Sequence, residues 1–146
     1  MTNAELSPLV EVVERLLAPG GCPWDRAQTY ATIVPYTIEE AYEVADAIAR
    51  EDWTELRDEL GDLLFQVVFY ARMAEEQGRF DFNEICRAIS DKLERRHPHI
   101  FGDANFTDSE QVLANWEKTN SAERAEKAQH STLDDIPASL PALMRA

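Results

Sequence analysis

Residues 38–43 read IEEAYE and residues 59–66 read ELGDLLFQ, and both stretches place acidic residues at helical spacing. The three glutamates of the first stretch fall within an arc of about 100° when the segment is wound as an α-helix. In the second stretch, Glu59 and Asp62 form an i, i+3 pair, and Gln66 continues the same side of the helix. Each stretch therefore predicts an amphipathic helix whose carboxylates gather on one face.

Helical periodicity extends outward from both stretches along most of the chain. Apolar residues at helical spacing predict helices over residues 6–17, 37–50, 51–76, 82–96 and 107–127. We expect Asp81 to cap the fourth of these helices, and Thr107 with Glu110 to form a capping box at the start of the fifth. No segment of useful length alternates with the period of a strand. The sequence therefore predicts an all-α fold.

The length and the tail of the chain indicate one helical domain. A chain of 146 residues has the length of a single domain and can bury a sizeable core. We expect this domain to occupy residues 1–127. Pro137 and Pro141 interrupt the remaining segment, residues 128–146, which has only short apolar runs. That segment is predicted to be a linker followed by the start of a further element.

The composition excludes several classes of protein. The formal net charge is −14, whereas proteins that bind duplex DNA or anionic membranes need a basic surface. Cys22 and Cys86 are predicted to be reduced thiols rather than a disulfide framework. The first residues lack the pattern of a signal peptide, and no apolar run is long enough to span a membrane. We therefore expect a soluble, cytoplasmic domain.

The gathered carboxylates have two interpretations. Acidic residues commonly line the solvated face of an amphipathic helix, and this interpretation suits residues 37–50 taken alone. Beyond Asp62, however, the same side of the next helix is apolar, and carboxylates at the edge of a core are costly unless they are paired or bind metal. Five carboxylates at close range repel one another unless cations offset their charge. Hard oxygen ligands of this kind favour Mg²⁺, with Mn²⁺ as a substitute.

A divalent cation would also allow this acidic protein to bind an anionic polyphosphate, because the ion neutralises charge on both partners. Direct cations occur at the end of the fourth predicted helix, in Lys92, Arg95 and Arg96. Their alternative role is to place favourable charge at a helix C-terminus. Trp24, in the middle of a predicted loop, either stacks on a base or anchors that loop against the helices.

Two further motifs accompany the acidic stretches: CPWDRAQT at residues 22–29 and RRHPHIFG at residues 95–102. Together with IEEAYE and ELGDLLFQ, and in this order, they resemble the MazG family of all-α nucleoside triphosphate pyrophosphohydrolases. The resemblance covers about residues 6–127. It implies a four-helix-bundle-like core assembled as a dimer or higher oligomer, with Mg²⁺ at the acidic cluster.

The resemblance also implies roles for individual residues. The implied metal ligands are Glu40, Glu43, Glu59 and Asp62. Glu39 would complete the catalytic group by binding a second ion or by orienting the attacking water. The implied substrate contacts are Lys92, Arg95 and Arg96 for the phosphates, and Trp116 or Lys118 for the nucleotide.

The activity that the resemblance implies is hydrolysis of nucleoside triphosphates, including deoxynucleotides, between the α- and β-phosphates. The products would be a nucleoside monophosphate and pyrophosphate. The implied cellular role is housekeeping of the nucleotide pool. The best-known family members carry two such domains, and this sequence resembles the first of them. The alternative is therefore a non-catalytic oligomerisation or regulatory domain of a longer, two-domain enzyme.

The helix predicted over residues 51–76 is apolar over more of its surface than one neighbouring helix can cover. The residues concerned are Phe65, Val68, Phe69, Tyr70 and Met73. Gly61 is expected to let another helix approach closely. Because monomers rarely tolerate an exposed apolar patch of that size, we expect at least a homodimer, with the active site close to or across the interface.

Overall fold

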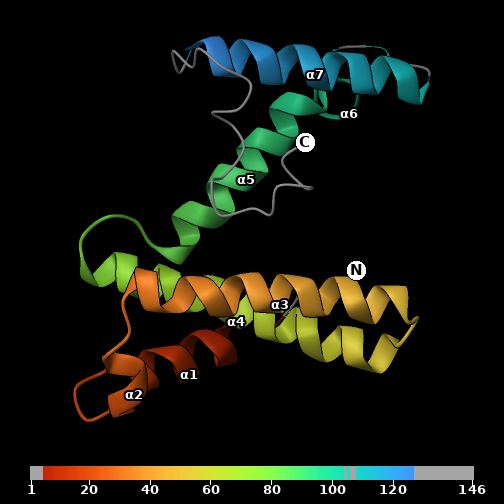
Figure 1. The fold of residues 1–146 in the computed structure, drawn as a ribbon. Helices are drawn as coiled ribbons and strands as arrows, with labels where there is room; N and C mark the ends of the chain where they lie inside the picture. The colour runs from red at the N-terminus through yellow and green to blue at the C-terminus, as the bar shows by residue number, and fades with distance from the viewer. Residues whose placement is uncertain (1–4, 104, 106–107, 127–146) are drawn as a thin grey trace. The chain divides into compact units, whose positions relative to one another are not determined.

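The computed structural model of the chain describes residues 5–103, 105 and 108–126 (Figure 1). Its elements are α1 (Ser7–Leu17), α2 (Pro23–Arg26), α3 (Tyr30–Ala49), α4 (Trp53–Glu76), α5 (Phe82–Arg96), α6 (Pro98–Phe101) and α7 (Ser109–Glu126). No strand occurs in this described part of the chain, and the all-α prediction is confirmed. None of the described helices is long and apolar enough to cross a membrane.

The chain forms two compact units, Met1–Arg87 and Ala88–Ala146, and α5 begins in the first and continues into the second. The predicted linker over residues 128–146 lies outside the described residues, so the proposed division after residue 127 stays a prediction.

The turn after α1 depends on two glycines. Gly20 has a φ of +82°, a left-handed conformation that glycine adopts without strain. A Cβ on Gly21 would collide with the backbone carbonyl oxygens of Leu16 and Arg15. The tight turn leads into α2, which replaces part of the expected loop, because Pro23 at a first helical position is favourable to a helical turn.

Helix α3 begins at Tyr30, earlier than the predicted start at residue 37. Pro35 lies inside this helix, where a proline removes one backbone hydrogen bond. The predicted start was wrong because Thr29 and Thr32 cap the helix reciprocally just before Tyr30, with hydrogen bonds of 3.3 and 2.8 Å between side chain and backbone N–H. Ile33, in the first turns of α3, is buried in the core, and its packing stabilises this part of the helix.

Helices α3 and α4 form an antiparallel hairpin whose connection is short (Figure 1). Asp52 caps α4, because its Oδ1 accepts a hydrogen bond of 3.1 Å from the backbone N–H of Glu55. Glu51, in the connection, has a φ of +54°. This hairpin places the acidic faces of the two helices opposite one another.

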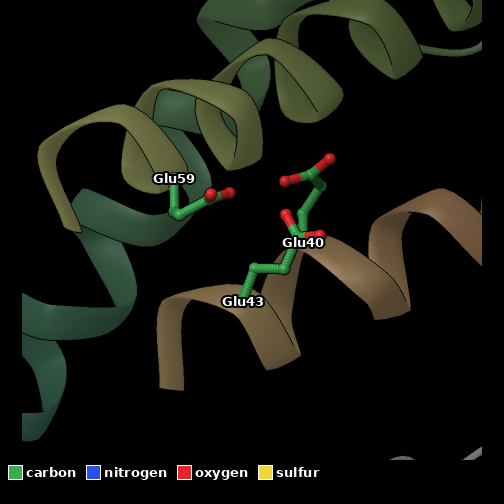
Figure 2. A group of neighbouring side chains, drawn as sticks. All are labelled: Glu40, Glu43 and Glu59. Atoms are coloured by element: carbon green, nitrogen blue, oxygen red, sulfur yellow. The ribbon is translucent and has the colours of Figure 1, made fainter. Parts of the chain in front are cut away.

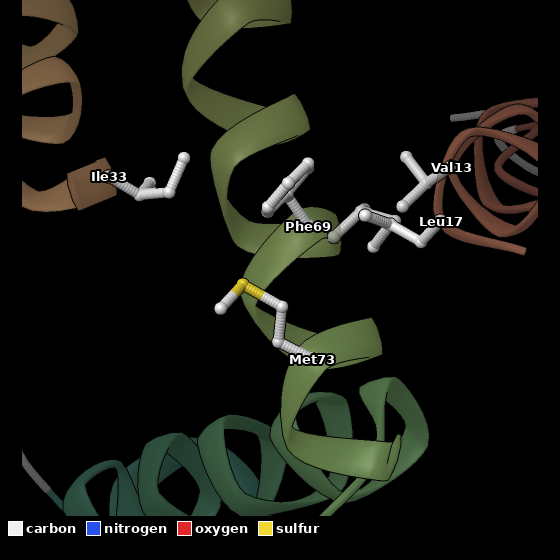
Figure 3. Close-up of a cluster of buried hydrophobic side chains, with 6 residues drawn as sticks. Val13, Leu17, Ile33, Phe69 and Met73 are labelled. Atoms are coloured by element: carbon white, nitrogen blue, oxygen red, sulfur yellow. The ribbon is translucent and has the colours of Figure 1, made fainter. Parts of the chain in front are cut away.

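The core of the first unit lies between α4 and two partners, α1 and α3. Figure 3 shows its side chains, with Phe69 and Met73 of α4 between Ile33 of α3 and the pair Val13 and Leu17 of α1. The sequence predicted a dimer because these apolar residues of α4 were expected to be exposed. That expectation of exposure was wrong, because α1 and α3 cover this face of α4. The residues involved are buried or packed against the core: Phe65, Val68, Phe69, Tyr70 and Met73.

The predicted caps of the later helices have different outcomes. Asp81 caps α5 as expected: its Oδ1 accepts a hydrogen bond of 2.9 Å from the Glu84 N–H, and Glu84 Oε2 accepts one of 2.8 Å from the Asp81 N–H. For α7, Asp108 Oδ1 accepts a hydrogen bond of 2.9 Å from the Gln111 N–H. Thr107, the expected cap, lies outside the described residues.

Candidate metal centre

Three glutamates meet where α3 and α4 face one another (Figure 2). Glu40 and Glu43 lie one helical turn apart on α3, and Glu59 projects toward them from α4. Each offers one carboxylate oxygen, and these oxygens all lie within 4.8 Å of one another. The antiparallel hairpin therefore converts two separate acidic stripes into a single cluster.

The cluster is partly removed from solvent. Glu59 is only 9% exposed, and Glu40 and Glu43 are half-buried. Among the described residues, Oε2 of Glu40 and Oε2 of Glu59 are buried and have no hydrogen-bond partner. A buried carboxylate oxygen without a partner is destabilising, so both atoms point to a ligand or a proton that offsets this cost.

The carboxylates change one another's acidity. A hydrogen bond to Glu43, burial and a hydrogen bond to Glu55 raise the pKa of Glu59 to about 8. Burial, followed by the charges of Glu43 and Asp62, raises the pKa of Glu40. The metal-free cluster therefore holds a proton near neutral pH where an isolated glutamate would be ionised.

This donor set fits a divalent cation. Carboxylate oxygens are the hard ligands that Mg²⁺ and Mn²⁺ prefer, and two of them here lack any other partner. A bound cation would replace the proton of Glu59 and offset the repulsion among the three charges.

The other two predicted members of the acidic group occupy different positions. Asp62 is exposed on α4 and lies outside the group of three, but its charge acts on Glu40. Glu39 is exposed on α3 and also lies outside the group. Sequence reasoning missed Glu55, which hydrogen-bonds to Glu59. Its i, i+4 spacing to Glu59 on one helix face was the available signal.

The predicted phosphate contacts belong to the second unit, where two of them are paired with α7. Arg96 is buried, and its Nη2 donates to Glu123 Oε2 at 2.6 Å and to Asn120 Oδ1 at 2.9 Å. Its guanidinium lies 5.0 Å from the centre of the Trp116 ring. Arg95 Nη2 donates to Glu123 Oε1 at 3.3 Å. The pairing lowers the pKa of Glu123, chiefly through its hydrogen bond with Arg96.

Sequence reasoning did not identify Asn120 and Glu123 as partners of these arginines. They follow Trp116 at i+4 and i+7 and so share its helix face, but the spacing gives no indication of which helix they contact. Of the remaining predicted contacts, Lys92 is half-buried on α5 and Lys118 is exposed on α7.

Trp24 lies in α2, and its side chain is exposed. Its ring meets that of Tyr36 edge-on, with 6.1 Å between the centroids. Gln28 Nε2 donates to the Trp24 carbonyl at 2.8 Å, a hydrogen bond within this motif. The contact with Tyr36 anchors Trp24 against α3, and the exposed part of the Trp24 ring is accessible to a ligand.

The fold and the cluster together define an all-α protein with a candidate divalent-metal centre between two antiparallel helices. A family model described as "MazG nucleotide pyrophosphohydrolase domain" matches residues 28–101. The chain belongs to this family, which confirms the resemblance seen in the sequence.

Relatives of known name agree with the assignment. The chain is 67% identical to the nucleoside triphosphate pyrophosphohydrolase of Escherichia coli K12, covering 97% of this chain and 54% of that protein. It is 41% identical to the nucleoside triphosphate pyrophosphohydrolase/pyrophosphatase MazG of Thermotoga maritima, covering 94% of this chain and 52% of that protein. The chain therefore spans about half the length of these curated relatives.

A solved structure shares the fold. The crystal structure of a mazG-related protein from Thermotoga maritima matches with a TM-score of 0.65 and 25% sequence identity. The match covers 78% of this chain and 97% of that one.

Proposed function

We propose that this domain hydrolyses nucleoside triphosphates between the α- and β-phosphates, with Mg²⁺ bound at the carboxylate cluster. The observation that carries the proposal is the group formed by Glu40, Glu43 and Glu59, in which two buried oxygens lack a partner. The names of the Escherichia coli and Thermotoga maritima relatives support the substrate class and the reaction.

Each carboxylate has a distinct task in this proposal. Glu40, Glu43 and Glu59 hold the cation, and Asp62, whose charge already acts on Glu40, is the fourth ligand. When bound, Mg²⁺ supplies Lewis-acid polarisation of the phosphates and lowers the pKa of bound water. Glu39 binds a second ion or accepts a proton from the attacking water, and its exposed carboxylate is accessible for that role. Mn²⁺ substitutes because it prefers the same oxygen ligands.

The substrate contacts follow from cationic and aromatic side chains. Lys92, Arg95 and Arg96 contact the phosphates, and the partly exposed ring of Trp116 contacts the nucleoside. The guanidinium of Arg96 stacked on Trp116 supports this pairing, because it places a cation and an aromatic face together.

Lys118 and Trp24 are the remaining candidates for contact with the nucleotide, and both side chains are exposed. Each has an open surface position, and Trp24 offers an aromatic face for a base.

Product analysis tests the reaction. The protein, incubated with a panel of ribo- and deoxyribonucleoside triphosphates, is expected to release nucleoside monophosphate and intact pyrophosphate only when Mg²⁺ or Mn²⁺ is present. Anion-exchange chromatography separates the products, and Glu59→Gln serves as the inactive control. Nucleoside diphosphate and orthophosphate as first products would contradict cleavage at the α-phosphate.

The second candidate function is a non-catalytic regulatory or oligomerisation domain. The observation that favours it is that the chain spans only 54% of the Escherichia coli relative, so catalysis could reside in the remaining part of such a protein. The product assay combined with a measurement of Mn²⁺ binding separates the two: a protein that binds Mn²⁺ but turns over no nucleotide supports the second candidate.

A homodimer is part of the proposal. Trp53, Leu60 and Leu64 are exposed along one side of α4, and Ile48 is exposed on α3. A Cβ at Gly61 would meet no atom within 4 Å, so no other helix in the described part of this chain packs closely against this glycine. The surface at Gly61 is therefore available to a second copy of the chain. Covering this apolar surface would place an interface beside Glu59.

Sedimentation tests the assembly. Wild-type protein is expected to sediment as a dimer at micromolar concentration, and Leu64→Lys is expected to shift it toward monomer, because burying a lysine charge in an apolar interface is costly. A folded wild-type monomer with full activity would rule the dimer out. We also infer a cytosolic location, which the two free thiols support.

A further inference from the structure

A hydrogen-bonded polar group connects α3 and α4 next to the acidic cluster. Thr37 Oγ1 lies 3.1 Å from Gln66 Oε1 and 2.6 Å from Tyr70 Oη. The single Thr37 proton is directed at two acceptors, Gln66 Oε1 and the Ile33 carbonyl at 3.3 Å, so the Tyr70 hydroxyl donates to Thr37 Oγ1. Gln66 is only 8% exposed. The three side chains therefore form a directional chain in the interior of the helix pair.

The polar group and the acidic cluster occupy consecutive turns of the same interface. Thr37 precedes Glu40 by one turn on α3, and Gln66 follows Asp62 by one turn on α4. Because the helices are antiparallel, one turn forward on α3 faces one turn back on α4. The interactions follow this order along the two helices. Thr37 hydrogen-bonds to Gln66, and one turn further along α3 the charge of Asp62 acts on Glu40. One more turn along, Glu43 hydrogen-bonds to Glu59.

Metal binding requires that α3 and α4 keep their relative position along the helix axes to within less than the rise of one residue. Its ligands come from both helices, and their oxygens lie within 4.8 Å of one another. A slide of one helix by one residue moves its ligands by about 1.5 Å. Mg²⁺ requires oxygen ligands at about 2.0–2.1 Å in near-octahedral geometry, so such a slide is incompatible with tight binding.

Apolar packing alone does not fix that alignment well. The core side chains, Ile33 and Phe69 among them, make non-directional apolar contacts, and volume-conserving substitutions among such residues cost little stability. Hydrogen bonds at 2.6 and 3.1 Å lose most of their strength when their atoms move by an ångström or more.

We propose that Thr37, Gln66 and Tyr70 are positioning residues that fix the register of α3 against α4 and thereby hold the carboxylates at metal-binding separation. The inference rests on the proposed function, since it requires the cluster to bind a divalent ion. Thr37 is its central member, because its single hydroxyl bridges the other two side chains.

The test measures binding of Mn²⁺ alone to the 146-residue protein, followed by electron paramagnetic resonance of the free ion. Thr37→Val keeps the shape of the side chain and removes the hydroxyl, and it is expected to weaken Mn²⁺ binding by about 10-fold, as for loss of a residue that orients metal ligands. Thr37→Ser restores the hydroxyl and is expected to bind within about 2-fold of wild type.

A matched control lies at the other end of the same helix pair. Tyr30 Oη donates to Gln77 Oε1 at 2.8 Å and also joins α3 to the end of α4, but it precedes Glu40 by almost three turns. Tyr30→Phe is expected to lower the thermal midpoint of unfolding, as Thr37→Val does, while leaving Mn²⁺ affinity unchanged. If Thr37→Val does not fold, Tyr70→Phe replaces it, with an expected loss of about 3-fold.

The outcomes separate the inference from the function on which it rests. Wild-type affinity in Thr37→Val, an equal loss in Thr37→Ser, or an equal loss in Tyr30→Phe would each overturn the positioning role and leave the metal centre intact. Absence of Mn²⁺ binding by the wild-type protein would overturn both.

Discussion

The carboxyl groups of Glu43 and Glu59 hydrogen-bond to one another across the interface of α3 and α4, and this contact is the largest cause of the rise in the pKa of Glu59 to about 8. A protonated carboxyl is thus part of the folded, metal-free protein at neutral pH. Binding of a divalent cation must displace that proton, so metal affinity and pH are linked.

The first prediction concerns the stability of the metal-free protein. The pKa of Glu59 rises from 4.5 to about 8 in the folded state, so folding favours its protonated form. This contribution is fully present below pH 4.5 and is lost as the pH rises through 8, because the folded state binds more protons between these values. Urea unfolding with chelator is expected to show a free energy of unfolding that falls from pH 5 to pH 8.

Glu59→Gln is the matched control for that measurement. Its side chain is isosteric and does not titrate, so the decline between pH 5 and pH 8 is expected to flatten. Added Mg²⁺ is expected to restore stability in the wild-type protein at pH 8 and to have no such effect in the variant. An equal decline in both proteins would assign the pH dependence to other groups.

The second prediction separates the members of the acidic group by their positions. Glu59 lies within the cluster, whereas Glu39 is exposed outside it. Isothermal titration with Mg²⁺ is expected to show a loss of 100-fold or more in Glu59→Gln, because an ionised ligand is removed. Glu39→Gln is expected to stay within about 3-fold in metal affinity while losing turnover. A comparable loss of metal affinity in both variants would place Glu39 among the primary ligands.

The acidic cluster was predictable because its members lie close together in sequence on each helix. Glu40 and Glu43 share one face by helical geometry alone, and Glu59 lies on the acidic face of the next helix. A short connection between two such helices makes them antiparallel neighbours, so their like-charged faces meet. Local periodicity therefore contained most of the information about the site.

Other features depend on contacts that periodicity does not specify. Pro35 is compatible with α3 only because the cap at Thr29 and the burial of Ile33 stabilise the preceding turns. The bond between Arg96 and Glu123 joins two helices that are separated by α6, and no local pattern indicates it. Coverage of Phe69 by α1 likewise depends on which helix packs on which face.

The third prediction concerns the core of the first unit. Phe69 is 2% exposed and packs between α1 and α3. Phe69→Ala is expected to lower the free energy of unfolding by about 3–5 kcal/mol, because it removes buried apolar surface and leaves a cavity. Val12, on α1, is 53% exposed, so Val12→Ala is expected to change the free energy of unfolding by no more than about 0.5 kcal/mol. Equal losses in chemical denaturation would contradict the packing described for α4.

The fourth prediction concerns Arg96, whose guanidinium joins the end of α5 to α7 through Glu123, Asn120 and Trp116. A lysine keeps the charge but lacks the planar fork that donates to two acceptors while lying on an aromatic ring. Arg96→Lys is therefore expected to accelerate amide hydrogen exchange in α7 by about 10-fold, since charge-assisted hydrogen bonds are lost, and to leave exchange in α3 and α4 unchanged. Mass spectrometry of peptides from each helix measures both effects in one experiment. Unchanged protection of α7 would show that the guanidinium of Arg96 does not hold this helix.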